Sequence, residues 1–277
     1  MKKGRKRWGI QFVFGAFLSL LPLPLRADTL PTYAADSLIK TIETRYLPWI
    51  AFEADLMLQF STPEGKSGIC RGELLYHRLD EKILLKCFNA KGKLLFVFKT
   101  NDRQFELYLP GRQALFHGDI FDLADSPDID FHLNPLDLYR ALKPLAVPYE
   151  GTEIERWGRD ILRLKIHSEK GREKSYLSRE LIMNTQGDVS LETYYSFKGE
   201  PILVIRRLEY RQIKIPDAAM RNKITFPYRI EIESSSAKKE TKLLIQQLRF
   251  PDVFTEEEWL YPVAPGTEVI ALEPTYQ

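Results

Sequence analysis

The chain has 277 residues, of which 44% are hydrophobic, and it carries 40 Lys and Arg against 38 Asp and Glu. Residues 1–27 hold six of the basic residues and none of the acidic ones, so residues 28–277 have 34 basic and 38 acidic side chains, a net charge of about −4. A protein that binds nucleic acid presents a clustered basic surface, so this balance argues against a nucleic acid partner.

The amino-terminal segment has the features of a secretory signal peptide. The basic stretch KKGRKR (residues 2–7) precedes an apolar run, WGIQFVFGAFLSLLPLPL, with no charge before Arg26. We predict cleavage after Ala27 and export to the periplasm of a Gram-negative-type bacterium. A retained membrane anchor is the alternative, because an apolar run of about 18 residues can span a bilayer, but Pro22 and Pro24 at its end argue against it. No cysteine lies near the cleavage point, which excludes a lipid-modified amino terminus.

A helix and a first group of strands are predicted next. Residues 31–46 place apolar side chains at helical spacing. Residues 50–60, IAFEADLMLQF, alternate almost regularly between apolar and polar side chains, which predicts a strand with one solvent-exposed face. Further short alternating segments, separated by turn residues, predict antiparallel neighbours at residues 69–78, 82–88, 93–99, 104–110 and 113–118.

The alternation of apolar and polar residues stops over residues 119–145 and then resumes. Asn134 is a good helix N-cap, Pro135 fits the first helical position, and Pro144 would end the helix. Strands are predicted again at residues 160–167, 174–183, 189–197, 202–213, 223–234 and 241–250. The fold class predicted is mainly β (α+β): a large curved antiparallel sheet forming an incomplete (half) β-barrel, with an amino-terminal helix and a central lid helix in its hollow. Since no flexible linker or repeat interrupts residues 28–277, we expect a single domain.

Both cysteines lie in the exported part of the chain. A turn near RLDEK (residues 78–82) would set Cys70 and Cys87 almost opposite each other across a hairpin, and an oxidising compartment would let them form a disulfide. The alternative is two buried free thiols, because a shift of one residue in register would send the side chains to opposite faces.

The sequence offers little for catalysis or metal binding. The four histidines lie on separate segments, and neither a zinc-type H-E-x-x-H nor a G-x-S-x-G elbow is present. Asp125, Asp128 and Asp130 lie close together but lack the glycine and closing glutamate of a calcium loop, which favours a solvated acidic loop. We therefore expect no catalytic residue, no metal and no cofactor.

The order of the first segments resembles the periplasmic lipoprotein-carrier superfamily, which includes the LolA carrier, the LolB acceptor and the RseB sensor. The resemblance, closest to a LolA-like outer-membrane lipoprotein-sorting protein, lies in SLIKTIETRYLPWIAFEADLMLQF, then GELLYHR, then FKTNDRQFELYLPGRQALF. It implies that Arg78 stands where the carriers place the arginine that ties the lid helices over the cavity; a solvated turn arginine is the alternative. Leu79 replaces the proline that usually follows, the acceptor's lipobox cysteine is absent, and the second half is longer and less easily matched.

The resemblance implies a carrier that binds an acylated lipoprotein or other lipid and shuttles it towards the outer membrane. An inner-membrane donor and an outer-membrane acceptor protein are the further partners implied, and we expect a monomer. A cell-envelope sensor on the same fold is the alternative function. An acyl chain needs only an apolar hollow, at roughly 0.8 kcal/mol per CH₂ buried, and ordinary core is the alternative for every lining candidate. The lining candidates are Leu38, Ile42, Phe52, Leu56, Leu58, Phe60, Leu74, Tyr76, Phe96, Phe98, Phe105, Leu107, Leu136 and Tyr139.

Overall fold

The computed structural model describes residues 28–29, 32–46, 50–61, 67–121, 135–142, 147–148, 150–157, 159–170, 174–213, 224–234, 239–251 and 253–272. The predicted signal peptide and the acidic group at Asp125, Asp128 and Asp130 lie outside these residues. In the part of the chain that is described, no helix combines the length and the apolar character needed to cross a membrane.

The described residues form two α-helices, one short 3₁₀ helix and fifteen strands that belong to one sheet. The order across the sheet is β1-β8-β9-β10-β11-β12-β13-β14-β2-β3-β4-β5-β6-β7-β15, and every pair is antiparallel except β7 with β15. The bounds are β1 Asp28–Thr29, α1 Thr32–Tyr46, β2 Ala51–Ser61, β3 Ser67–His77, β4 Lys82–Phe88, β5 Leu94–Asn101, β6 Gln104–Leu109, β7 Ala114–Asp119, α2 Pro135–Leu142, β8 Thr152–Trp157, β9 Ile161–Lys170, β10 Lys174–Asn184, β11 Val189–Tyr195, β12 Pro201–Ile213, β13 Ile224–Ser234, β14 Lys239–Arg249, η2 Glu256–Trp259 and β15 Glu268–Ala271.

Alternation of side chains decides which face of each strand is buried. In β2, Phe52, Ala54 and Leu56 are buried, while Glu53 and Asp55 between them are partly exposed. A strand with this pattern can cover a core with one face and meet water with the other. The two predicted helices and the predicted strands are confirmed within a few residues at their ends, and the structure adds β1, β8, β15 and η2.

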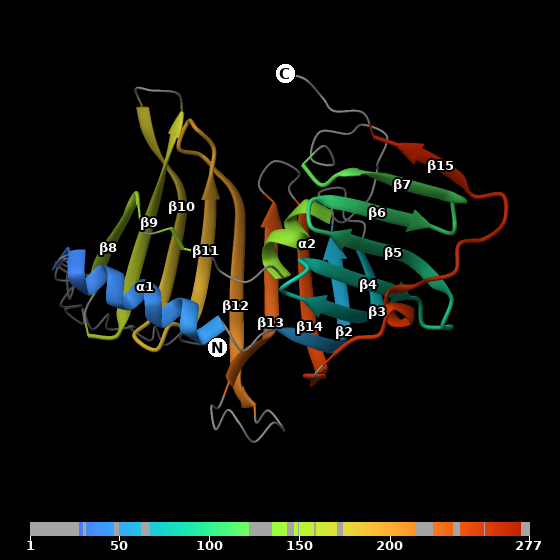
Figure 1. The fold of residues 1–277 in the computed structure, drawn as a ribbon, viewed down its shortest axis with the longest axis horizontal. Coiled ribbons are helices and arrows are strands. Elements are labelled where there is room, and N and C mark those ends of the chain that lie inside the picture. Colours follow the sequence, from blue (N-terminus) through green and yellow to red (C-terminus); the bar gives the residue numbers. More distant parts are fainter. Residues whose placement is uncertain are drawn as a thin grey trace, which may run out of the picture.

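The sheet curves around the two helices but does not close, because its end strands β1 and β15 are not neighbours. Figure 1 shows α1 crossing β8 to β11 and α2 lying at the middle of the sheet, where it contacts β13. Ile39 and Ile42 of α1 and Leu138 of α2 are buried in the same apolar cluster as the inward-facing strand residues. The predicted fold class, a mainly-β incomplete barrel with helices in its hollow, is thus confirmed.

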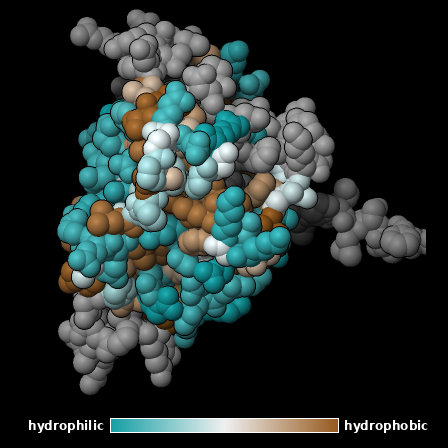
Figure 2. Space-filling view, turned by 90° about the vertical axis from the view of Figure 1, so that its right-hand side faces the viewer, coloured by the Kyte–Doolittle hydropathy of each residue, from teal (hydrophilic) through white to brown (hydrophobic). Residues whose placement is uncertain are grey.

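The carboxyl-terminal segment covers part of the opposite, convex face. We call residues 250–251 and 253–272 the C-terminal strap. Trp259 of the strap packs with Leu84, Val97 and Tyr108, which point away from the hollow. The strap then pairs as β15 beside β7. Figure 2 views the molecule from this end and shows hydrophobic residues in patches among hydrophilic ones.

Candidate functional site

The predicted lining residues come together on the concave face of the sheet. Twelve of the fourteen are buried, and Leu38 and Phe60 are partly buried and pack against the same cluster. Register explains this placement, because residues directly opposite on neighbouring strands share a face. Leu74, Leu85, Phe98 and Leu107 stand opposite one another in turn across β3, β4, β5 and β6. The concave face therefore carries a continuous apolar wall.

Aromatic side chains form one end of this wall. The ring of Phe52 stacks on that of Tyr76, with centroids 4.8 Å apart, and meets the ring of Phe226 edge-on at 5.1 Å. Burial raises the pKa of the Tyr76 hydroxyl well above its ordinary value, although the charge of Arg78 lowers it. Tyr76 therefore stays neutral.

The helix α2 is held over the wall by a contact at the β3–β4 turn. The Tyr139 hydroxyl donates a hydrogen bond to Glu81 Oε2 at 3.2 Å. Arg78 belongs to the same turn, is partly buried, and donates its backbone N–H to the carbonyl of Ile50 at 2.7 Å. Its predicted role as the residue that ties the lid stays a prediction.

A second contact holds the carboxyl end of α2 to β12. Arg207 Nη2 donates to the backbone carbonyl of Ala141 at 3.2 Å, and Arg207 Nη1 donates to Glu192 Oε2 at 2.8 Å. Arg179 Nε donates to the other oxygen of Glu192 at 2.7 Å. Burial raises the pKa of the Glu192 carboxyl, but Arg179 and Arg207 outweigh it and hold that pKa below its ordinary value. Glu192 is therefore an anion with two cationic partners inside the hollow.

Sequence reasoning missed this ion cluster, although β12 contained a signal for it. Leu203 and Ile205 are buried and face the hollow, and Arg207 is the next residue of the same face. A charged side chain on an inward-facing position needs a partner or a function, because burying an unpaired charge is costly. The sequence around Glu192 did not indicate an ion pair, because its partners Arg179 and Arg207 lie on the neighbouring strands β10 and β12.

The cysteines form a disulfide across β3 and β4. Their Cα atoms are 6.0 Å apart. Gly72, not Cys70, stands directly opposite Cys87, so the bridge runs diagonally across the hairpin. The missing side chain of Gly72 leaves room for Leu56, whose Cδ1 atom would lie 2.5 Å from a Cβ placed there.

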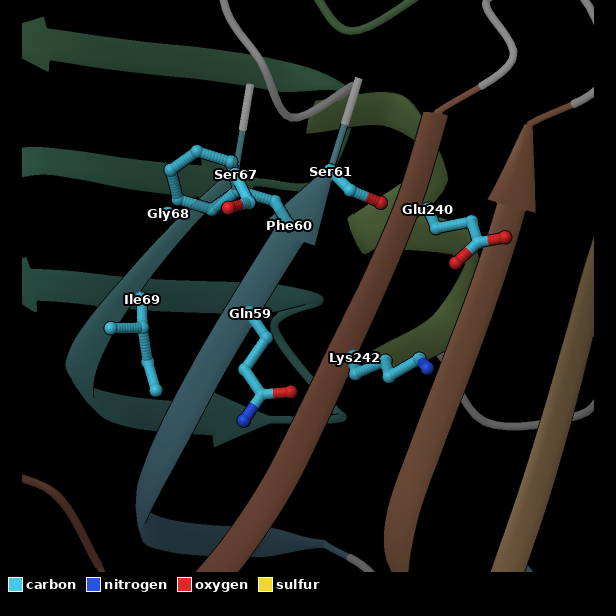
Figure 3. A pocket seen from close by; sticks show the side chains of 8 residues that line it. All are labelled: Gln59, Phe60, Ser61, Ser67, Gly68, Ile69, Glu240 and Lys242. Atoms are coloured by element: carbon cyan, nitrogen blue, oxygen red, sulfur yellow. The ribbon is translucent and has the colours of Figure 1, made fainter. Parts of the chain in front are cut away.

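Two surface pockets lie beside the wall. One, of about 410 Å³, lies at the ends of β2, β3 and β14 (Figure 3), where the ring of Phe60 lies over Gly68. Phe60, predicted as a lining residue, therefore stands at the rim. The other, of about 320 Å³, lies between the convex face and the C-terminal strap, and charged side chains dominate its lining, among them Glu53, Glu258 and Arg249.

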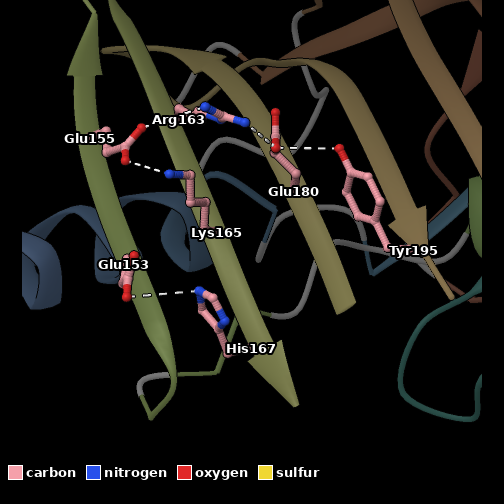
Figure 4. A network of polar contacts seen from close by, with 7 residues as sticks. All are labelled: Glu153, Glu155, Arg163, Lys165, His167, Glu180 and Tyr195. Carbon is pink, nitrogen blue, oxygen red and sulfur yellow. Dashed lines mark hydrogen bonds and ion pairs between the residues drawn. The ribbon is translucent and has the colours of Figure 1, made fainter. Parts of the chain in front are cut away.

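A network of paired charges covers the convex face of β8 to β10. Figure 4 shows it, with α1 behind the strands. Lys165 Nζ lies 2.5 Å from Glu155 Oε1, and Arg163 Nη2 lies 2.6 Å from Glu180 Oε2. A hydrogen bond from Lys165 lowers the pKa of Glu155. In the described ranges no group of His, Cys, Asp and Glu side chains could hold a metal ion. These charges pair across strands, as expected of a solvated sheet face.

Comparison with solved structures shows a shared fold, while no family profile and no curated protein matches the sequence. An outer membrane lipoprotein-sorting protein domain from Vibrio parahaemolyticus aligns with a TM-score of 0.53 at 12% identity, over 81% of this chain and 97% of that one. A DUF1329 family protein from Desulfovibrio piger aligns with a TM-score of 0.54 at 13% identity, over 83% and 98%. A LolA superfamily protein from Nitrosomonas europaea aligns with a TM-score of 0.48 at 13% identity, over 81% and 98%. The first two likenesses extend over most of the chain, and the chain has a LolA-like fold.

Proposed function

We propose that this protein is a periplasmic carrier that binds the acyl chains of a lipoprotein or another lipid in the hollow between the concave wall and α2, and moves them towards the outer membrane. In this proposal residues 28–277 act as one exported, monomeric domain without catalytic residues, and an inner-membrane donor and an outer-membrane acceptor are its protein partners.

The observation that carries the proposal is the apolar wall covered by a short helix. α2 has eight residues and is held to the sheet through Tyr139 and through the carbonyl of Ala141. Helices shorter than about 12 residues are marginal alone, so α2 depends on these contacts and on packing. An acyl chain that replaced α2 side chains against the wall would gain about 0.8 kcal/mol for each CH₂ group buried.

The likeness to a lipoprotein-sorting protein domain agrees with this proposal at the level of the fold. The proposal itself depends on the wall, because a fold alone hosts many functions.

A charge placed in the wall tests the proposal. Leu74, the first residue of the row, is 1% exposed, so Leu74→Glu would put a carboxylate where water cannot solvate it and should abolish binding of a fluorescent fatty acid. Leu79→Glu is the matched control, because Leu79 is 73% exposed at the β3–β4 turn and its replacement should leave binding unchanged. Thermal unfolding of both variants separates lost binding from lost structure. If the Leu74→Glu variant folds and binds the fatty acid as tightly as wild type, the wall is an ordinary core and the proposal is refuted.

The role of Arg78 is tested separately. Arg78→Leu removes the guanidinium from the turn that contacts α2, and should change the rate of fatty acid uptake or release while the fold survives. Unchanged rates would refute the lid role and leave the cavity proposal standing. Mass spectrometry of lipids extracted from the protein purified from a periplasm would identify the cargo.

A further inference from the structure

The β3–β4 turn lies between the helix α2 and the C-terminal strap, and it contacts both. Glu81, the last residue of the turn, accepts the hydrogen bond from the Tyr139 hydroxyl of α2 at 3.2 Å. Lys82, the first residue of β4, places its Nζ atom 5.8 Å from the centre of the Trp259 ring and 3.8 Å from Glu256 Oε1, both in the strap. Two residues that are adjacent in the chain therefore contact elements on opposite faces of the sheet.

The alternation of side chains along β4 explains these opposite directions. Ile83 and Leu85 belong to the main apolar cluster in the hollow, whereas Leu84 between them packs with Trp259 on the convex side. Successive residues of a strand point to opposite faces, so Lys82 shares the convex face with Leu84. The strap contacts hold Lys82 on that face, at the point where the turn enters β4.

The backbone of the turn is strained at Glu81. Its φ is 48°, in the left-handed region that residues other than glycine seldom adopt. Such a conformation persists only where the surrounding structure holds it. The N–H of Glu81 donates to the carbonyl of Arg78 at 3.1 Å, and its side chain is held by Tyr139. Because the strap holds the next residue, Lys82, loss of the strap contact would remove one restraint and let the turn relax.

The contact between the turn and the strap is weak enough to break without unfolding the sheet. The Glu256 side chain is 91% exposed, so water and salt screen its ion pair with Lys82. The contact between Lys82 and the Trp259 ring is also modest at a partly exposed site. If the strap left, β4 would keep its pairing with β3 and β5. Displacement of the strap would therefore act first on the turn.

We propose that the β3–β4 turn couples the C-terminal strap to α2, so that release of the strap loosens α2 over the hollow. The coupling itself does not depend on what the hollow binds. Its use rests on the proposed function: an acceptor protein that displaces the strap would release the cargo without entering the hollow. The strap is accessible from outside, since Val253 and Leu260 are exposed.

Hydrogen exchange of α2 tests the coupling in the full-length exported protein. The amides of residues 139–142 are those with partners inside this eight-residue helix, so their exchange reports its opening. Lys82→Gln removes the charge from the strap contact and leaves Trp259 in place. We expect these amides to exchange about threefold faster, as for the loss of one exposed cation–ring contact. Exchange in α1 should not change, which separates local loosening of α2 from destabilisation of the whole protein.

Lys99→Gln is the matched control. Lys99 Nζ also lies over a strap ring, that of Tyr261 at 5.9 Å, and its side chain is 24% exposed against 21% for Lys82. Lys99 stands opposite Leu84 on β5 and not at the turn, so its replacement should leave α2 unchanged. Trp259→Ala, which releases the strap, should accelerate the α2 amides at least as much as Lys82→Gln. Equal exchange of α2 in the two lysine variants would overturn the coupling.

A double-mutant cycle tests the route through Glu81. Glu81→Ala removes the acceptor of the Tyr139 hydroxyl and should itself accelerate exchange of α2. In that background Lys82→Gln should have no further effect, and additive effects would refute the turn as the connection. Release of a fluorescent fatty acid should become faster in the same variants as exchange does. Faster exchange without faster release would keep the coupling and overturn its use in the carrier; no binding of the fatty acid would overturn the proposed function, and exchange would still decide the coupling.

Discussion

Replacing Glu192 by glutamine tests how much the buried ion cluster contributes to stability. Glutamine has nearly the same shape, so the packing stays, but its amide cannot serve two guanidinium groups as an anion does. The buried Arg207 and the partly buried Arg179 would then lose that counter-charge. Breaking a buried ion pair in this way typically costs about 3–5 kcal/mol. In a chain of this size each kcal/mol lowers the melting temperature by about 2–4 °C, so we expect a loss of about 6–20 °C.

The neighbouring arginine supplies a matched control. Arg206, the residue before Arg207, pairs with Glu233, and these two side chains are 38% and 42% exposed. Because water and salt screen such a pair, Glu233→Gln should cost at most about 1 kcal/mol. The two substitutions are chemically identical, so the difference between their melting temperatures measures the effect of burial.

We also expect the difference in melting temperature between wild type and Glu192→Gln to depend on pH. The pKa of Glu192 is lowered in the folded protein, so its contribution is fully present above its unfolded pKa of about 4.3 and is lost as the pH falls through the folded value. The difference in melting temperature between wild type and Glu192→Gln should therefore be constant near neutral pH and shrink below about pH 4. A loss no larger than that of Glu233→Gln, or a difference that does not change in acid, would refute the assignment of Glu192 as a buried anion.

Three further predictions concern other parts of the chain. Trp259→Ala should cost about 3–5 kcal/mol of local packing and release the C-terminal strap, so that a protease cuts the strap in limited proteolysis. Leu260→Ala, at an exposed position, should leave the strap resistant to the protease. Equal resistance of both variants would contradict the packing described. Alkylation without reductant should add no mass to the exported protein, and two added groups would show that Cys70 and Cys87 are free thiols. Amino-terminal sequencing of the exported protein should start at Asp28, and a chain that starts at Met1 and sediments with membranes would rule out cleavage after Ala27.

The alternation of apolar and polar residues made the strands of the apolar wall predictable. The strands β1, β8 and β15, near the two edges of the sheet, lack this alternation and were not predicted. β2 and β3 carry long alternating patterns, so their bounds and buried faces followed from the sequence within a few residues. In β8 only Ile154 is buried, so the pattern was too weak to recognise. β15 is four residues long and pairs in parallel beside β7, and no local signal encodes a partner so distant in sequence.

The candidate site also has a part that the sequence predicted and a part that it did not. Its apolar residues were predictable, since each follows from the periodicity of its own strand. The contact between Arg207 and α2 was not, because it joins residues 66 positions apart in the chain. The diagonal placement of the cysteines depends on the exact register of one hairpin, which the turn sequence alone did not determine.

The order of strands has a consequence for folding kinetics. β2 to β7 are consecutive hairpins, so this half can form from contacts that are local in the sequence. β2 must also pair with β14, where Glu53 meets Arg249 at a separation of 196 residues. Closing so long a loop is entropically costly and slow. We therefore expect an early intermediate in which β2 to β7 are paired while their apolar wall still faces water, a species that would aggregate unless β8 to β14 follow quickly.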